Sequence, residues 1–209
     1  MSRGRQGING KIGAALLAVT ALLLSGCSNP SDAASFKNGK VTIEELQASV
    51  STILEERTKF NTTPQDALTG EALTLNQLEF HVFSALLTQA AKERNVTALP
   101  GEISSRRAEV LQNVGGEEQL SVALVNAGIA SIDLEEYLAL IVLQDKLRSV
   151  IAPTATDDAQ VIQELQKMLA DTATNEKLTL NPRYGVWNSQ TNRIDPVDPT
   201  DGALPADKQ

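Results

Sequence analysis

Cys27 is the only cysteine in the 209 residues of the chain, and the residues before it suggest what its thiol is for. A lone thiol is reactive and cannot form an internal disulfide. Leu24, Ser25 and Gly26 come directly before it, after a basic stretch at 1–11 and an apolar run at 12–24. That order is typical of a secretory signal, and the apolar run is shorter than the roughly 20 residues of a membrane-spanning helix. The order of these segments predicts that the chain is cleaved and anchored at this point.

The run Leu24-Ser25-Gly26-Cys27 resembles the lipobox of bacterial lipoproteins. The resemblance implies cleavage between Gly26 and Cys27 and a diacylglyceryl lipid on Cys27. It also implies that the protein is held at the extracytoplasmic face of the cell membrane or envelope. Two acyl chains anchor a protein firmly, whereas one chain is marginal. The alternative is an ordinary secretory signal with an incidental cysteine, although an exported protein gains nothing from an unpaired thiol.

No other pattern predicts catalysis or a cofactor. His81 is the only histidine and lies at the edge of the apolar side of a predicted helix. No neighbouring Ser, Cys or Asp arrangement would make it a general acid or base, so we expect a hydrogen-bonded or half-exposed structural histidine. Gly115-Gly116 lacks the lysine and the preceding strand of a phosphate-binding loop. We expect no catalytic residue, and no cofactor other than the lipid on Cys27.

A metal site is not expected either. Cys27 is assigned to the lipid, and one histidine does not make a zinc ligand set. Asp195, Asp198 and Asp201 are spaced by three residues rather than two, and they lack the glycine and terminal glutamate of a calcium loop. A solvated acidic tail is the better interpretation of these aspartates.

The net charge limits the partners. It is −8 for the whole chain and would be −11 without residues 1–26, which carry three basic residues and no acidic one. That balance opposes binding to nucleic acid or to anionic lipid headgroups. Aromatic residues make up only 3% of the chain, so the core is expected to be aliphatic, as helix packing prefers.

Local signals near the start predict a hairpin that leads into a helix. Asn38-Gly39 between short flanks favours a type I′ turn at 36–41. Thr42 with Glu45 three residues later forms a capping box that opens the first helix. The second helix is expected to begin at a cap on Thr74 and to end near residue 95.

The remaining signals predict a mainly α fold of about six helices. Further helices are expected at 102–112, 117–127, 133–151 and from 157 onward, followed by a short strand at 177–180. The stretch 138–143 is apolar on every side, so its helix has to be surrounded by other elements. We divide the chain into a signal peptide at 1–26, a tether at 27–35, a helical domain at 36–171, a C-terminal strand and aromatic segment at 172–194, and a disordered tail at 195–209.

The order of these elements resembles the SurA N-terminal domain family, whose module is related to trigger factor and to PrsA-type foldases. The resemblance spans about 36–171. It rests on Asn38-Gly39, on Thr42 before Glu44-Glu45-Leu46, on the stretch 90–96, on the helix start at Glu102-Ile103 and on Gly128 before the long apolar helix. It implies a helical module that binds unfolded or newly exported polypeptides through apolar grooves, without ATP.

One departure from the family concerns enzymatic activity. Many full-length relatives carry a parvulin-type prolyl isomerase domain of about 90 residues with paired histidines. Here only 172–209 remains beyond the helical part, and the chain has a single histidine. We therefore expect a chaperone that is not an enzyme. An adaptor or ligand-binding lipoprotein with one dedicated partner is the alternative.

The C-terminal segment contributes two candidate contacts. Tyr184 and Trp187 carry much of the remaining aromatic content and could contact a client polypeptide. The alternative is structural, because Tyr and Trp bury large areas while each keeps a polar end. In that case the segment packs the end of the chain onto the helical body, beside the opening hairpin.

Overall fold

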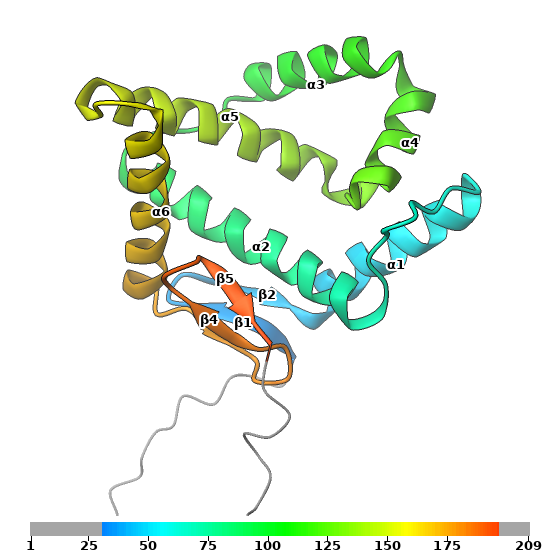
Figure 1. The fold of residues 1–209 in the computed structure, drawn as a ribbon, viewed down its shortest axis with the longest axis horizontal. Helices are drawn as coiled ribbons and strands as arrows, with labels where there is room; N and C mark the ends of the chain where they lie inside the picture. The colour runs from blue at the N-terminus through cyan, green and yellow to red at the C-terminus, as the bar shows by residue number, and fades with distance from the viewer. Residues whose placement is uncertain (1–30, 197–209) are drawn as a thin grey trace, which may run out of the picture.

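The computed structural model describes residues 31–196, so Gly26, Cys27, the signal peptide and the tail beyond 196 lie outside the described residues. Within this range the protein is mainly helical, with short antiparallel strand elements at the start and near the C-terminal end (Figure 1). This confirms the predicted fold class. None of the helices between residues 31 and 196 has both the length and the apolar character needed to cross a membrane.

The opening hairpin consists of β1 (Asp32–Phe36) and β2 (Gly39–Thr42), and its turn differs from the prediction. Phe36 pairs with Gly39, so the turn residues are Lys37 and Asn38, and neither has the positive φ that a type I′ turn requires. The residue that ends α6 (Asp158–Asn175) holds the turn instead. The Glu176 carbonyl accepts a hydrogen bond from the Lys37 amide at 2.6 Å, and the Glu176 carboxylate accepts one from Asn38 Nδ2 at 2.9 Å.

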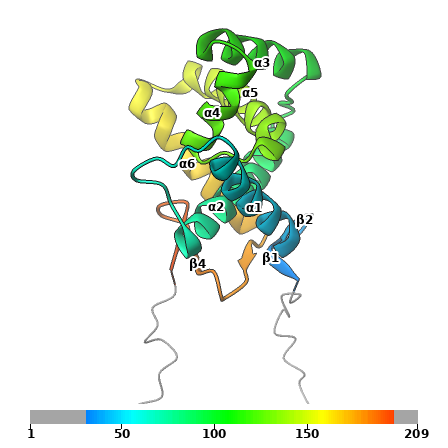
Figure 2. The same ribbon diagram turned by 90° about the vertical axis from the view of Figure 1, so that its right-hand side faces the viewer.

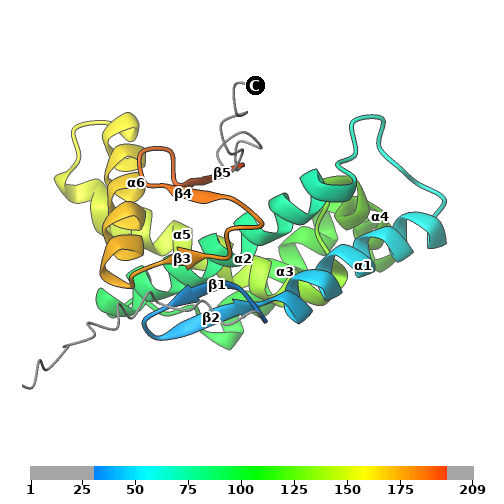
Figure 3. The ribbon, with the colours of Figure 1, turned by 90° about the horizontal axis from the view of Figure 1, so that it is seen from below.

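The predicted tether at 27–35 is wrong for its last four residues, because they form most of β1. Ala33 and Ala34 are fully buried in the main core. β1 is the central strand of a three-stranded sheet, between β2 and β3 (Thr179–Leu180). Figure 3 shows β3 lying beside β1. Small side chains allow the strand to approach the helices closely, whereas in the sequence the same composition resembles a flexible linker.

α1 (Ile43–Lys59) begins as predicted, with a complete capping box between Thr42 and Glu45. Leu46 and Ile53 on its inner side are fully buried. α2 (Gly70–Glu93) begins four residues before the predicted cap. Thr74 lies inside the helix, where its hydroxyl donates to the Gly70 carbonyl oxygen at 3.0 Å.

The capping box predicts an acid-sensitive contribution to stability. The Thr42 backbone N–H donates to the Glu45 carboxylate at 2.8 Å and lowers the pKa of Glu45 below its ordinary 4.5. A carboxyl whose pKa is lower in the folded state than in the unfolded state stabilises the fold at pH values above the unfolded-state pKa. This contribution is lost as the pH falls through the folded-state pKa. Glu45→Gln should therefore reduce the free energy of unfolding at pH 7 by less than about 1 kcal/mol, because the side chain is largely exposed.

Denaturant unfolding between pH 7 and pH 3 tests this expectation. The difference in free energy of unfolding between Glu45→Gln and the wild type should become smaller below about pH 4.5, where the wild-type carboxyl also becomes neutral. Glu44→Gln removes a carboxylate from the same first turn but leaves the capping box intact. An equal effect of the two substitutions at pH 7 would contradict the role of the box.

The next helices end where the glycines predict. α3 (Pro100–Val114) and α4 (Glu117–Ala127) are followed by Gly115 and Gly128, whose φ values of 95° and 68° are left-handed. The short 3₁₀ turn Ser131–Asp133 leads into α5 (Leu134–Ile151), and a second such turn, Ala152–Thr154, leads to α6 (Asp158–Asn175). Figure 1 shows α5 between α3 and α2, and α5 also contacts α6, so the apolar helix is surrounded as predicted.

The buried side chains form two larger regions and a third of three residues, Ile53, Leu73 and Ala130, between α1, α2 and the turn before α5. The main core joins the strands to α2, α6 and the second half of α5. A smaller cluster joins α3, α4 and the start of α5 around Leu120, Leu124, Leu134 and Leu138. In Figure 2 this α3–α4 lobe lies at the end of the molecule opposite the strands. No residue of α3 is fully buried, so the lobe depends on a small core.

The C-terminal segment is part of the same body. The predicted boundary after 171 falls inside α6, and the following residues pair with β1 through β3. Next comes a second hairpin, β4 (Val186–Asn188) and β5 (Arg193–Asp195), in which Trp187 pairs with Ile194. Asp195 was predicted to begin a disordered tail, but it ends β5.

Candidate functional site

A hollow of about 350 Å³ lies between α2, the turn before α5, and the β4–β5 turn. We call it the apolar hollow, because four large side chains line it: Phe80 and Phe83 from α2, Ile129 from the turn, and Tyr137 from α5. All four are partly exposed. Concave surfaces of this size with aromatic walls are the usual form of a binding site.

Local sequence and one long-range hydrogen bond shape this hollow. Phe80 and Phe83 are three residues apart, so they share one side of α2. Gly128 ends α4 in a left-handed conformation, and Gln77 of α2 donates to the Gly128 carbonyl oxygen at 3.0 Å. Ala130, which follows, is fully buried. The turn is thereby fixed against α2, and it places Ile129 opposite the two phenylalanines.

The β4–β5 turn closes the remaining side with polar groups. Arg193 forms an ion pair with Glu79 at 3.0 Å, and Glu79 also accepts from the Ile194 amide at 3.0 Å. Asn192 Nδ2 donates to the Gln166 carbonyl oxygen at 2.8 Å, which identifies Oδ1 as the free acceptor. This Oδ1 is buried and has no hydrogen-bond partner among residues 31–196. The hollow therefore combines apolar walls with an unused acceptor in its lining.

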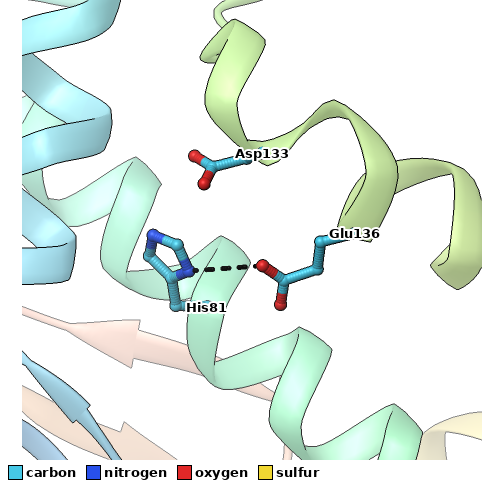
Figure 4. A group of neighbouring side chains, drawn as sticks. All are labelled: His81, Asp133 and Glu136. Atoms are coloured by element: carbon cyan, nitrogen blue, oxygen red, sulfur yellow. Dashed lines mark ion pairs between the residues drawn. The ribbon is translucent and has the colours of Figure 1, made fainter.

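A second hollow of about 510 Å³ adjoins the first at Asp133, which lines both, and most of the residues that line it are polar or charged. We call it the polar hollow. His81 and Ser84 of α2 face Glu136 of α5 across it, and Ser84 donates a hydrogen bond to Glu136 Oε1. His81 Nδ1 lies 3.9 Å from Glu136 Oε2, and Asp133 lies next to both (Figure 4). This group of three side chains comes from α2, the 3₁₀ turn and the first turn of α5.

His81 was expected to be hydrogen-bonded or half-exposed, and it is hydrogen-bonded with its side chain 11% exposed. Its Nε2 lies 3.0 Å from Ser49 Oγ of α1, and its ring contacts Phe80 edge-on at 5.1 Å between centroids. Sequence reasoning missed the carboxylates beside it. Asp133 and Glu136 are more than 50 residues away along the chain, and no local pattern links them to α2.

Tyr184 and Trp187 line neither hollow. Both are half-buried and pack against the main core, and the Arg183 guanidinium lies 5.2 Å from the centre of the Tyr184 ring. Trp187 Nε1 is buried without a hydrogen-bond partner in the described part of the chain. This packing is the structural alternative named above, and their contact with a client stays a prediction.

No family model, curated protein or solved structure matches this chain. The resemblance to the SurA N-terminal domain family therefore rests on the residues quoted above. The lipid on Cys27 stays a prediction for a residue outside the described range.

Proposed function

We propose that this chain is a lipid-anchored, extracytoplasmic chaperone that holds exported polypeptides without ATP and is not an enzyme. The apolar hollow is the observation that carries the proposal. It offers Phe80, Phe83 and Tyr137 to a ligand in a concavity of about 350 Å³. That volume takes apolar side chains of an unfolded segment but not a folded domain.

The chemistry of the hollow suits an extended polypeptide. An apolar client side chain against the aromatic walls gains about 25 cal/mol for each Å² of apolar surface removed from water. The client backbone supplies N–H donors, and polar side chains of the lining such as Asn76 offer acceptors to them. Ordering the client opposes these gains, so binding is weak and reversible, as a holding function requires.

The anchor is proposed from the sequence alone. The run Leu24-Ser25-Gly26-Cys27 would attach the N-terminus to a membrane at the extracytoplasmic face. The anchored protein would then meet its clients at the extracytoplasmic face, where exported chains emerge from the membrane. The acidic net charge, −11 once residues 1–26 are removed, supports polypeptides rather than nucleic acid as partners.

Light scattering of a chemically unfolded test protein as it aggregates tests the proposal. The purified chain should suppress aggregation at a near-stoichiometric ratio without nucleotide. Tyr137→Asp places a charge in the wall of the apolar hollow and should raise the dissociation constant for an apolar peptide at least about tenfold, a loss of about 1.4 kcal/mol.

Val150→Asp is the matched control, because Val150 is an exposed apolar residue of the same helix outside the apolar hollow. It should suppress aggregation as the wild type does. If the wild-type chain does not suppress aggregation, or if Tyr137→Asp behaves like Val150→Asp, the proposed client site is wrong.

The alternative is a ligand-binding or adaptor lipoprotein with one dedicated partner. The volume of the hollow favours it, since sites for small molecules begin at about 300 Å³ and combine apolar walls with a few polar groups. A pull-down from envelope extract separates the two functions. A dedicated partner appears at one fixed stoichiometry, whereas a chaperone retains many unrelated unfolded chains.

A further inference from the structure

We propose that His81, Asp133 and Glu136 bind a divalent transition-metal ion of the Zn²⁺ class in the polar hollow. One potential ligand atom from each residue lies within 4.8 Å of the other two. The three side chains converge on a common space in Figure 4, although they come from α2, the 3₁₀ turn and α5. This inference is independent of the proposed chaperone function.

The hydrogen bonds of Ser49 are compatible with the His81 tautomer that a metal ion needs. Ser49 has one hydroxyl proton, and the Glu45 carbonyl oxygen lies 3.3 Å from its Oγ as an acceptor for that proton. With the proton there, Oγ accepts from His81 Nε2 at 3.0 Å, and Nε2 carries the ring proton. In a neutral ring Nδ1 then keeps its lone pair, on the side that faces Glu136. A lone pair and a carboxylate oxygen 3.9 Å apart cannot hydrogen-bond to each other, but they can share a cation.

Two buried serines hold the ligand atoms in place. Ser49 is fully buried and Ser84 is 4% exposed. Ser84 donates to Glu136 Oε1 and leaves Oε2 free on the side of His81. Metal-binding histidines almost always donate their other ring N–H to a fixed acceptor, and metal-binding carboxylates are hydrogen-bonded in turn. Both supporting contacts are already formed here.

Asp133 supplies the third ligand. Its Oδ2 is buried and has no hydrogen-bond partner within 31–196. An unpaired carboxylate oxygen removed from water is unfavourable unless a positive charge or a donor compensates it. Lys40 and Lys92 also line the polar hollow, and the Lys40 ammonium is paired with Asp32 at 3.0 Å. A divalent cation between Asp133 and Glu136 would compensate both carboxylates.

The donor set selects the class of ion. One imidazole nitrogen with two carboxylate oxygens suits Zn²⁺, whereas Mg²⁺ and Ca²⁺ prefer oxygen ligands throughout. Two ligands at about 2.1 Å from one Zn²⁺ lie roughly 3.4 Å apart at the tetrahedral angle. The 3.9 Å between Nδ1 and Oε2 exceeds this by about 0.5 Å, and all the ligand atoms lie within 4.8 Å of one another, so the side chains have to approach by roughly 0.5–1.4 Å to hold the ion. The fourth position would face the hollow, where it could take water.

NMR of the histidine ring nitrogens in the full-length chain tests the proposal directly, because His81 is the only histidine. One equivalent of ZnCl₂ should shift the Nδ1 resonance and leave Nε2 protonated. This readout follows atoms of His81, so zinc bound at the Cys27 thiol cannot be mistaken for it. Unchanged ring resonances at one equivalent of Zn²⁺ would overturn the proposal.

Calorimetric titration with ZnCl₂ then tests the carboxylates. Glu136→Gln keeps an acceptor for Ser84 but removes the charge, and it should weaken Zn²⁺ binding at least tenfold, as should Asp133→Asn. Glu55→Gln removes an exposed carboxylate elsewhere and should bind as the wild type does. MgCl₂ at the same concentration should give no saturable binding. Equal affinities of Glu136→Gln and Glu55→Gln for Zn²⁺ would mean that Glu136 is not a ligand and would overturn the proposed site.

Discussion

Gly185→Ala is expected to lower the free energy of unfolding by about 2–4 kcal/mol. Gly185 comes directly before β4 and has a φ of 138°, a conformation that side chains rarely adopt. A Cβ there would overlap the Asp195 carbonyl oxygen and would lie 2.8 Å from Ile194 Cγ2. The β4–β5 hairpin would therefore have to move away from the main core, where Ile194 is buried.

Denaturant unfolding of Gly185→Ala can be followed by fluorescence, because Trp187 is the only tryptophan. Its emission should shift to the red already in the folded variant, since the half-buried ring leaves the core. Gly101→Ala is the control: a Cβ at Gly101 has open space around it and Gly101 lies in α3, so the effect should be neutral or slightly stabilising. Equal stability of the two variants would contradict the tight fit at Gly185.

Leu138→Ala is expected to lower the free energy of unfolding by about 2–5 kcal/mol, the usual range for truncating a fully buried leucine to alanine. Leu138 is 0% exposed and lies in the small cluster of the α3–α4 lobe. That cluster has only four buried members, and α3 contributes none of them. A cavity at Leu138 should therefore loosen the whole lobe rather than one side chain.

Amide hydrogen exchange locates the effect of Leu138→Ala. The amides of α3 and α4 should exchange faster than in the wild type, while those of α2 and α6 change less, because they belong to the main core. Val150→Ala truncates an exposed residue of the same helix and should change stability by less than about 0.5 kcal/mol. Uniformly faster exchange in all helices would show that the lobe does not open separately.

The features that sequence reasoning predicted well depend on residues close together in the chain. The capping box joins Thr42 to Glu45, and Gly115 and Gly128 end helices through their own backbone conformations. Helix starts and ends are decided within about one turn, so these signals could be read without the fold. The helix at 134–151 was also recognised as surrounded, because its stretch 138–143 is apolar on every side.

The predictions that failed depend on distant partners. The hairpin turn at Lys37 and Asn38 is held by Glu176, nearly 140 residues away, rather than by local turn chemistry. Ala33, Ala34 and Ser35 have the composition of a linker, and they lie in a central strand because β3, from the other end of the chain, pairs with Ala34 and Ser35. Local composition carries no information about such a partner.

The candidate sites also differ in whether adjacent residues or distant residues form them. The sequence alone determined the expected anchor at Cys27, because that signal lies in adjacent residues. Only the tertiary structure decided the apolar hollow and the group of His81, Asp133 and Glu136, because α2 and the start of α5 meet there. Residues within a few positions of one another are constrained by covalent geometry. Residues more than 50 positions apart come together only when burial of the core and the hydrogen bond from Gln77 to Gly128 fix the turn against α2.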